Sequence, residues 1–417
     1  MELKPSYKQT EVGVIPEDWT AVTLEAVTTH IGDGLHGTPV YTRNADYYFI
    51  NGNNLSHGKI IITPDTQTVD QKEFAQHQKP LSNRSILMSI NGTIGNLGLF
   101  QDQSLVLGKS AAYLNVRTDV SKLYVYYVLQ SSCVRQQFFD GLTGSTIGNL
   151  GLSAIRSTYI PLPLSDSEQA SIAKALGDAD DLLYSLDQLL IKKRSIKQAA
   201  MQELLTGKRR LPGFEGEWEM KKLGDTASLK ARIGWQGLTT AEYLDSGDFY
   251  LVTGTEIEKG RVSWHDCHYV DEARYKQDKF IQLRPRDVLV TKDGTIGKIA
   301  LVTDLPGPAT LNSGIFVIRP TENSFNPEFF YYLLCSQVFS EFLGQLAAGS
   351  TINHLYQKDF VSFSYRTPPA NEEQAEIAST LNAIDGELIA LQARLDKTRE
   401  IKQGMMQDLL AGRIRLQ

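Results

Sequence analysis

The sequence lacks a long apolar run, has few cysteines and carries no excess of positive charge. No stretch approaches the roughly 18 consecutive apolar residues of a membrane-spanning helix, and the opening residues MELKP lack the apolar core of a signal peptide. Three scattered cysteines among 417 residues exclude a disulfide framework and suit a reducing compartment. We therefore expect a cytoplasmic protein with no membrane contact.

The charge balance excludes a protein that holds nucleic acid by bulk positive charge. The formal net charge is −6, while 41% hydrophobic and 22% charged residues are ordinary for a folded protein. At roughly 100 to 200 residues per domain, the chain should form two to four domains. A DNA-binding protein of this composition needs local basic clusters or basic partners.

Two motifs for nucleotide chemistry are incomplete. An adenine methyltransferase needs Asn or Asp before Pro-Pro and an aromatic residue after it, but Pro368-Pro369 stands between Thr367 and Ala370. Residues 108–110 (GKS) end like a phosphate-binding loop, but Gln103 replaces its first glycine. We expect neither methyl transfer nor ATP binding by this chain alone.

Nuclease and metal motifs are incomplete as well. Asp65 and Asp70 are too close in sequence for a nuclease carboxylate cluster, and the second half of the chain has no equivalent. His265, Cys267 and His268 lack a second ligand pair at zinc spacing. We therefore expect no catalytic residues, no metal site and no cofactor in this chain.

An internal repeat organises the chain. Residues 168–211 align without gaps on residues 373–416, and 22 of these 44 positions are identical. The GTIG sequence of residues 92–95 also returns at residues 294–297. The order is therefore variable domain, helix, variable domain, helix. The predicted boundaries are 1–164, 165–209, 210–369 and 370–417.

The repeated segments have the apolar spacing of long helices. Apolar residues recur at alternating steps of four and three, which is the a/d seam of a coiled coil. Ser165 and Asn371 can cap the helix starts, and Gly207 and Gly412 stand where the helices should stop. The predicted seam residues are Ile172, Leu176, Ala179, Leu183, Leu186, Leu190, Ile377, Leu381, Ile384, Leu388, Leu391 and Leu395.

Both helices are acidic in the first half and basic in the second. Parallel pairing would set like charges side by side, whereas antiparallel pairing sets each acidic half beside a basic half. We therefore predict an antiparallel coiled coil that holds one variable domain at each end. The charge runs also complement the helix dipoles, which does not exclude this pairing.

The variable domains are predicted to mix strands and helices. Residues 123–129 and 327–334 resemble buried helices at equivalent places. Short apolar runs bounded by turn residues favour strands at 49–50, 59–62, 85–88 and 287–290. The expected fold class is α+β, with two mixed variable domains separated by two long helices in an antiparallel coiled coil and related by a pseudo-two-fold internal repeat.

Polar, glycine-rich loops recur at matching points of both variable domains. Glycine lets backbone approach a ligand, and Asn, Gln, Thr and His side chains can hydrogen-bond to base edges. A single such loop is more often a plain turn, but the recurrence favours DNA contact. The candidate loop contacts are Asp33, Gly34, His36, Thr38, Asn53, Asn54, Ser110, Ser145, Thr146, Trp235, Gln236, Thr239, Thr240, Thr253, Ser350, Thr351, Asn353 and His354.

Phosphate contacts must come from a few placed side chains, because neither variable domain is basic overall. Each such side chain has the alternative of being a solvated surface charge. The candidates are Arg43, Lys59, Lys109, Lys230, Arg232, Lys259, Arg261, Lys292 and Lys298.

The two variable domains between near-identical helices closely resemble the specificity (S) subunit of type I restriction-modification enzymes. The resemblance covers the whole chain. The helix ends at residues 196–207 and 401–416 carry it, and residues 33–39 and 234–239 look like the openings of that family's target recognition domains. These domains are similar to the DNA-reading domains of adenine-N6 methyltransferases.

The resemblance implies a division of labour. Each target recognition domain would read one half of an asymmetric, interrupted double-stranded DNA site, while the helices set the gap and dock methyltransferase (M) subunits, of which we expect two. Restriction (R) subunits would join the full complex. S-adenosylmethionine would serve M, and ATP with Mg²⁺ would serve R. The alternative is a structural coiled-coil adaptor with no sequence readout of its own.

Overall fold

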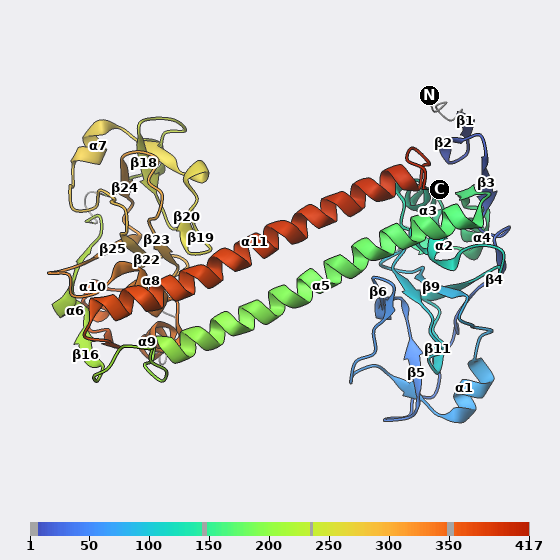
Figure 1. The fold of residues 1–417 in the computed structure, drawn as a ribbon, viewed down its shortest axis with the longest axis horizontal. Coiled ribbons are helices and arrows are strands. Elements are labelled where there is room, and N and C mark those ends of the chain that lie inside the picture. Colours follow the sequence, from blue (N-terminus) through green and yellow to red (C-terminus); the bar gives the residue numbers. More distant parts are fainter. Residues whose placement is uncertain (1–6, 144–147, 234–236, 348–353, 417) are drawn as a thin grey trace. The chain divides into compact units, whose positions relative to one another are not determined.

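The structure is a computed structural model in which the chain divides into two compact units. Unit 1 comprises residues 1–187 and 393–417, and unit 2 comprises residues 188–392. Two long helices, α5 (Asp166–Leu204) and α11 (Asn371–Leu409), contribute to both units (Figure 1). The described residues are 7–143, 148–233, 237–347 and 354–416.

The domain of unit 1 contains a four-stranded antiparallel sheet and a three-stranded mixed sheet. Its elements are β1 (Tyr7–Thr10), β2 (Gly13–Pro16), β3 (Trp19–Thr23), β4 (Thr28–Asp33), β5 (Tyr47–Ile50), η1 (Gly52–Asn54), β6 (Leu55–Ser56), β7 (Lys59–Ile60), β8 (Thr68–Val69), α1 (Gln71–His77), β9 (Ser85–Ser89), β10 (Leu97–Leu99), β11 (Leu105–Leu107), β12 (Ala111–Val116), α2 (Lys122–Val128), α3 (Ser132–Asp140), β13 (Leu142–Thr143), β14 (Asn149–Leu150), α4 (Leu152–Ser157) and β15 (Tyr159–Pro163). The strand orders are β10-β9-β12-β4 and β11-β5-β8, and β15 pairs with β3.

The domain of unit 2 repeats this topology. Its elements are β16 (Glu219–Lys222), α6 (Leu223–Thr226), β17 (Ala227–Lys230), η3 (Thr240–Glu242), β18 (Phe249–Val252), β19 (Ile257–Glu258), β20 (Arg261–Val262), η4 (Trp264–Asp266), β21 (His268–Val270), α7 (Glu272–Lys276), β22 (Val288–Thr291), β23 (Ile299–Leu301), β24 (Ala309–Leu311), β25 (Ile315–Pro320), α8 (Pro327–Leu334), α9 (Gln337–Leu346), α10 (Gln357–Phe360) and β26 (Ser364–Thr367). The orders β23-β22-β25-β17 and β24-β18-β21 match those of unit 1, and β26 pairs with β16 as β15 does with β3.

The aromatic helices α2 and α8 form the centre of each core. Ser121 caps α2, and Asn326 caps α8 ahead of a proline at the first helical position. In unit 1, α2 packs with the start of α5 and the end of α11, because Tyr124, Ile172 and Leu409 share one apolar cluster. The two predicted helix segments are therefore confirmed.

One predicted strand is shorter than expected. The apolar run at 59–62 forms a strand only over Lys59–Ile60. Ile61 donates its backbone N–H to the carbonyl of Asn54 instead of a strand partner, and its side chain is 40% exposed. The apolar residues at the end of this run, Ile61 and Ile62, are exposed, so they do not extend the strand.

The two long helices pair in antiparallel fashion within each unit. All twelve predicted seam residues are buried or half-buried. In unit 1, the acidic start of α5 meets the basic end of α11, where Asp180 pairs with Lys402. In unit 2, the halves exchange roles, and Lys197 pairs with Asp385. The predicted coiled coil is confirmed in both units.

The helices stop where glycine permits it. Gly207 and Gly412 follow α5 and α11 with φ angles of +72° and +66°, in the left-handed region where most side chains are strained. The carbonyls of each last turn are met by the following chain, as when Arg413 donates its N–H to Asp408. The chain can therefore turn back against its own domain.

The first turn of each helix is fixed to its domain by a buried glutamine. Gln169 accepts the N–H of Ser121 at 2.9 Å and donates to the carbonyl of Pro163 at 2.9 Å. Gln374 does the same in unit 2, with Asn326 at 2.8 Å and Pro368 at 3.1 Å.

A buried glutamate beside each glutamine binds an arginine that follows the other helix. In unit 1, Arg415 bonds to both Glu168 and Asp18, and its hydrogen bond holds the pKa of Asp18 below its usual value. In unit 2, Arg210 makes a bidentate bond to Glu373, with distances of 2.6 and 2.7 Å. Such forked pairs restrict geometry more strongly than a single contact.

Candidate nucleic-acid interface

In unit 1, parallel pairing of β5 with β11 brings the polar loops together. Because parallel strands end at the same edge, the residues after Ile50 and after Leu107 meet there. The loops after β4 and β9 reach the same place through their pairing with β12. We name this set loop cluster 1. It consists of residues 33–38, 51–54, 90–96 and 108–110.

Glycine allows the loops of cluster 1 to touch. A Cβ on Gly34 would lie 2.3 Å from the carbonyl oxygen of Gly108, and a Cβ on Gly108 would lie 2.2 Å from Asn51 Oδ1. A side chain at position 34 would require the backbone of residues 107–108 to move, and one at position 108 would displace the side chains of Asn51 and Phe49. These glycines thus serve loop-to-loop packing rather than a ligand.

Ser110 joins the loops at the centre of cluster 1. Its hydroxyl accepts the N–H of Gly52 at 2.9 Å and donates to Asn51 Oδ1 at 2.9 Å. Asn91 donates to the carbonyl of Lys109 at 3.3 Å, so the fourth loop joins the same group. The candidates Ser110 and Asn54 are therefore used internally, because Asn54 also bridges Asn51 and Ile61.

Four candidate side chains remain exposed on cluster 1: His36, Thr38, Asn53 and Lys109. The His36 ring lies 2.7 Å from Asp33, and its side chain is 74% exposed. Together they offer hydrogen-bond donors, acceptors and one cation on a single edge of the domain, as a readout of base edges and phosphates requires.

Unit 2 builds an equivalent surface on β18 and β24, which are also parallel. Asn312 donates its N–H to the carbonyl of Val252, as Gly108 does to that of Ile50. Lys292 likewise bonds to Gly314 as Ile90 does to Ser110. We name this surface loop cluster 2. It consists of residues 237–243, 252–256, 292–298, 312–314 and 354–356.

The repeated GTIG sequence forms the same turn in both clusters. Ser89 Oγ bonds to the carbonyl of Thr93 at 2.5 Å, and Thr291 Oγ1 bonds to that of Thr295 at 2.6 Å. The residue before each turn differs, with Asn91 in cluster 1 and Asp293 in cluster 2. The turn is thus a shared frame that presents different side chains.

Cluster 2 carries a different set of polar groups. Asp293 bonds to the His354 ring, which packs 4.5 Å from the ring of Tyr356. Lys298 donates to the carbonyl of Gly254 at 3.0 Å. Lys292 is half-buried, with Nζ 5.5 Å from the centre of the Phe316 ring.

Two threonine candidates of cluster 2, Thr239 and Thr253, bond within their own loops. Thr239 caps η3 by bonding to Glu242, and exposed Thr240 is the first residue of that turn. Thr253 donates its N–H to buried Glu256 at 2.6 Å, and its hydroxyl bonds to that of Thr255 at 2.6 Å. The hydrogen bonds of Thr239 and Thr253 therefore compete with any contact that these two side chains could make to a base.

Arg232 corrects one expectation. It is 1% exposed, and its guanidinium donates to the carbonyl of Leu311 at 2.9 Å and to Thr310 Oγ1 at 3.2 Å. Burial lowers the pKa of this group, with Arg274 adding to the effect. Arg232 therefore stabilises the fold and is not available to a phosphate.

Other basic candidates lie outside the clusters. Lys59 extends over the ring of Tyr184 on α5, 4.0 Å from its centre. Lys259 and Arg261 are exposed on the matching hairpin of unit 2, with Lys259 between β19 and β20 and Arg261 at the start of β20. Arg43 and Lys230 are exposed as well, with Arg43 in the loop before β5 and Lys230 at the end of β17.

Several candidates lie outside the described residues: Ser145, Thr146, Trp235, Gln236, Ser350, Thr351 and Asn353. Conversely, the expectation missed Asn91, Asp293, Asn312 and Tyr243, which contribute hydrogen bonds to the clusters. Asn91 and Asp293 were recognisable, because both directly precede the repeated GTIG turn.

The described residues show no group of three or more His, Cys, Asp or Glu placed to hold a metal ion. Burial also raises the pKa of Cys267 to about 12, which keeps its thiol protonated. None of the helices in the described ranges has both the length and the apolar character needed to cross a bilayer.

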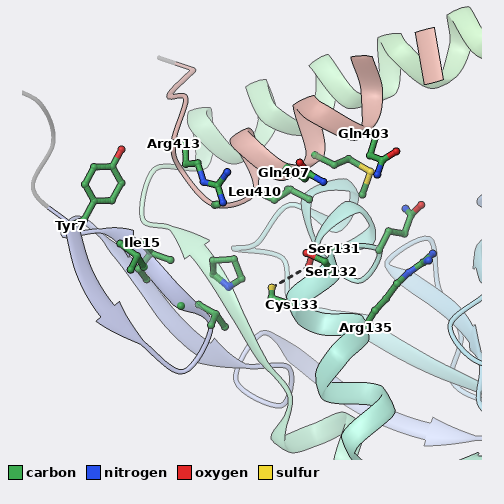
Figure 2. A pocket seen from close by; sticks show the side chains of 17 residues that line it. Tyr7, Ile15, Ser131, Ser132, Cys133, Arg135, Gln403, Gln407, Leu410 and Arg413 are labelled. Atoms are coloured by element: carbon green, nitrogen blue, oxygen red, sulfur yellow. Dashed lines mark hydrogen bonds between the residues drawn. The ribbon is translucent and has the colours of Figure 1, made fainter. Parts of the chain in front are cut away.

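A cavity of about 980 Å³ lies in unit 1, apart from loop cluster 1. Figure 2 shows Gln403 and Gln407 of α11, with Leu410 directly after this helix, on one side and the start of α3 on the other, where Ser131 and Cys133 are hydrogen-bonded. The hairpin of β1 and β2 completes the wall.

Comparison with known proteins identifies the family. The family described as "Type I restriction modification DNA specificity domain" matches twice, over residues 16–193 and 215–403. Each match contains one loop cluster and most of one long helix. The chain therefore belongs to this family, and its two domains make it a specificity subunit of a type I restriction-modification system.

The similarity to known specificity subunits extends over nearly the whole length of this chain and of those relatives. Two specificity subunits of Methanocaldococcus jannaschii are similar: MjaVIII is 24% identical over 96% of this chain and 94% of its own, and MjaIX is 21% identical over 99% and 97%. The crystal structure of an S subunit from M. genitalium superimposes with a TM-score of 0.61 at 18% identity, covering 98% and 99% of the two chains. That structure supports the fold.

Proposed function

We propose that loop clusters 1 and 2 each read one half of an interrupted, double-stranded DNA site. The observation that carries this is one loop frame with two sets of side chains. At matched backbone positions, Asn91 corresponds to Asp293 and Lys109 to Ser313. A surface that keeps its hydrogen-bonded frame and changes its donors and acceptors is suited to reading two different sequences.

The coiled coil is proposed to set the spacer and to dock the partners. The family's name implies an assembly with methyltransferase (M) and restriction (R) subunits, and the internal repeat predicts two M for each copy of this chain. Basic partner surface would supply the phosphate contacts that a chain of net charge −6 cannot make alone. Native mass spectrometry of coexpressed subunits should give the two-to-one complex. If the chain were found without bound M at every salt concentration, the proposed assembly would be contradicted.

Catalysis is assigned to the partners. S-adenosylmethionine would serve M, and ATP with Mg²⁺ would serve R, whereas this chain would bind none of them. We expect no methyl transfer from S-adenosylmethionine by chain free of M. Transfer that persists after rigorous removal of M would overturn this assignment.

Methylome sequencing of cells that express this chain with its M partner tests the proposal. We expect one bipartite motif, and substitution of Lys109→Ala together with Asn91→Ala should relax only one half of it. The matched control, Lys397→Ala, changes an exposed charge on α11 and should leave the motif intact. A motif that is unaffected by any cluster substitution would favour the adaptor role.

A further inference from the structure

Two of the lysines that stand at seam positions of the coiled coil, Lys197 and Lys402, occupy equivalent places in the repeat. Lys197 lies seven residues after Leu190 on α5, and Lys402 lies seven residues after Leu395 on α11, so both continue the a/d spacing. Their side chains are only 27% and 16% exposed. A charge at such a position is costly unless a partner meets it, so the partners determine which alignment of the helices is stable.

In unit 1, the partner of Lys402 is a carboxylate shared by three elements. Lys402 Nζ lies 2.6 Å from Asp180 Oδ1 on α5. The Tyr127 hydroxyl of α2 donates to the other oxygen, Oδ2, at 3.0 Å. Lys402 also lies 5.7 Å from the centre of the Tyr127 ring. One carboxylate thus ties both long helices to the recognition domain.

Unit 2 contains the same arrangement with the helices exchanged. Lys197 Nζ of α5 lies 2.6 Å from Asp385 Oδ1 on α11, and the Tyr332 hydroxyl of α8 lies 2.8 Å from Oδ2. Tyr332 also reaches Asn382 Oδ1 at 2.7 Å. Each member stands 205 positions from its counterpart in unit 1, so the triads are copies within the repeat.

The two tyrosines are deeply placed, at 4% exposed for Tyr127 and 1% for Tyr332. Burial, followed by the nearby aspartate, raises the pKa of each hydroxyl above its usual value, so both stay protonated and donate. The hydrogen bond therefore has a fixed direction at any physiological pH.

The apolar seam alone tolerates a slip of one heptad, because Leu and Ile recur at the same spacing. A slip would separate each lysine from its aspartate and leave both half-buried charges unpaired. Polar groups at seam positions are the best-attested means of fixing register in coiled coils. Here the same groups also hold the domain.

We propose that the triads Tyr127–Asp180–Lys402 and Tyr332–Asp385–Lys197 determine which DNA spacer length is accepted, by fixing helix register and the seat of each recognition domain. These are positioning residues that touch no DNA. The inference rests on the proposed function, since it concerns the gap between the two half-sites.

The test combines Tyr127→Phe with Tyr332→Phe in the full chain coexpressed with M. Phenylalanine fills the same space, so folding should survive while each domain loses its bond to the helix pair. Methylome sequencing should find both half-sites unchanged. Methylation of sites whose spacer is one base pair longer or shorter should rise about tenfold.

A second double variant, Lys197→Met with Lys402→Met, removes the charge that specifies register and should broaden the spacer further. The matched control is Lys397→Met, because Lys397 is 70% exposed and pairs with Glu400 on the same helix. The double variant Lys197→Arg with Lys402→Arg keeps the charge and should restore a single spacer.

The results of these experiments distinguish a failure of the triad proposal from a failure of the proposed function. A bipartite motif for the wild type with an equally strict spacer in the tyrosine variant overturns the triad proposal and leaves the proposed function standing. If the wild type gives no bipartite motif, the proposed function itself fails. If the lysine variant does not assemble, the tyrosine variant alone decides.

Discussion

The two units are alike where they join the helices and different where their loops are exposed. At the junctions, Tyr, Asp, Lys, Glu, Gln and Arg recur at the same places 205 residues apart. At the loop clusters, the same backbone bonds carry different residues, as in Gly108 against Asn312 and Ser110 against Gly314.

The contrast shows that the packing at the helix junctions restricts which residues can stand there, whereas the exposed loops accept different residues. Each triad at a junction joins side chains from three elements. Replacing one member therefore leaves a half-buried charge or a buried hydroxyl without its partner. A loop residue on a hydrogen-bonded backbone frame can change without altering the frame, because backbone groups make the bonds. The two loop clusters can therefore come to carry different side chains while the backbone frame and the helix junctions stay the same.

The largest expected effect comes from exchanging residues 212–368 for those of another specificity subunit. The segment carries loop cluster 2 and leaves every element of cluster 1 in place. One half of the methylated motif should be replaced completely, and the other half should stay. Methylome sequencing reads this directly, and a change in both halves would mean that the units do not read independently.

A matched heptad insertion should change the spacer alone. Seven residues placed between Leu183 and Leu190 of α5, and seven between Leu388 and Leu395 of α11, would keep both triads within their own units. The added length is about 10 Å, comparable to three base pairs. Both half-sites should persist with a longer gap. An active variant with altered half-sites and an unchanged gap would contradict the proposed role of the helices.

Arg232 and Lys292 separate stability from DNA contact within unit 2. Arg232→Ala leaves Thr310 and the Leu311 carbonyl without their donors and should cost roughly 3 kcal/mol. Lys292→Ala should change stability by less than about 0.5 kcal/mol and lower the salt dependence of DNA binding by about one charge.

Urea unfolding followed by hydrogen exchange in β24, and DNA affinity of the M complex at several salt concentrations, measure the two effects. A stable Arg232→Ala protein with a weaker salt dependence would restore Arg232 as a phosphate contact.

The helices could be predicted almost completely from sequence. Their signal is local, since the a/d spacing, the caps and Gly207 and Gly412 all lie on the segment that they describe. The charge polarity then selected antiparallel pairing. The aromatic helices were equally clear, because eight consecutive residues of α8 are apolar or aromatic apart from Glu328.

The loop clusters and the triads could not be predicted in detail. Which loops meet depends on the parallel pairing of β5 with β11, whose partners are 57 positions apart. A sequence shows the charge of Arg232 but not the strand that covers it. Likewise, Lys402 reads as a break in the seam, because its partner Asp180, and the Tyr127 hydroxyl that bonds to Asp180, are remote from it in sequence.

The smallest expected effect concerns the two repeat-related tryptophans. Trp19 Nε1 donates to Glu168 at 3.2 Å, whereas Trp218 Nε1 is buried and, among the described residues, has no hydrogen-bond partner. Both Trp→Phe changes remove similar volume, but only Trp19→Phe removes a bond to a carboxylate. That bond contributes about 1.5 to 3 kcal/mol, while loss of an unpaired N–H offsets part of the cost at Trp218. Trp19→Phe should therefore destabilise unit 1 by about 1 to 2 kcal/mol more than Trp218→Phe destabilises unit 2.

Hydrogen exchange in α2 and α8 measures the stability of the two units separately, with Trp264→Phe in η4 as the control. Equal losses would show that the bond from Trp19 to Glu168, which Arg415 also binds, adds nothing to the junction of unit 1.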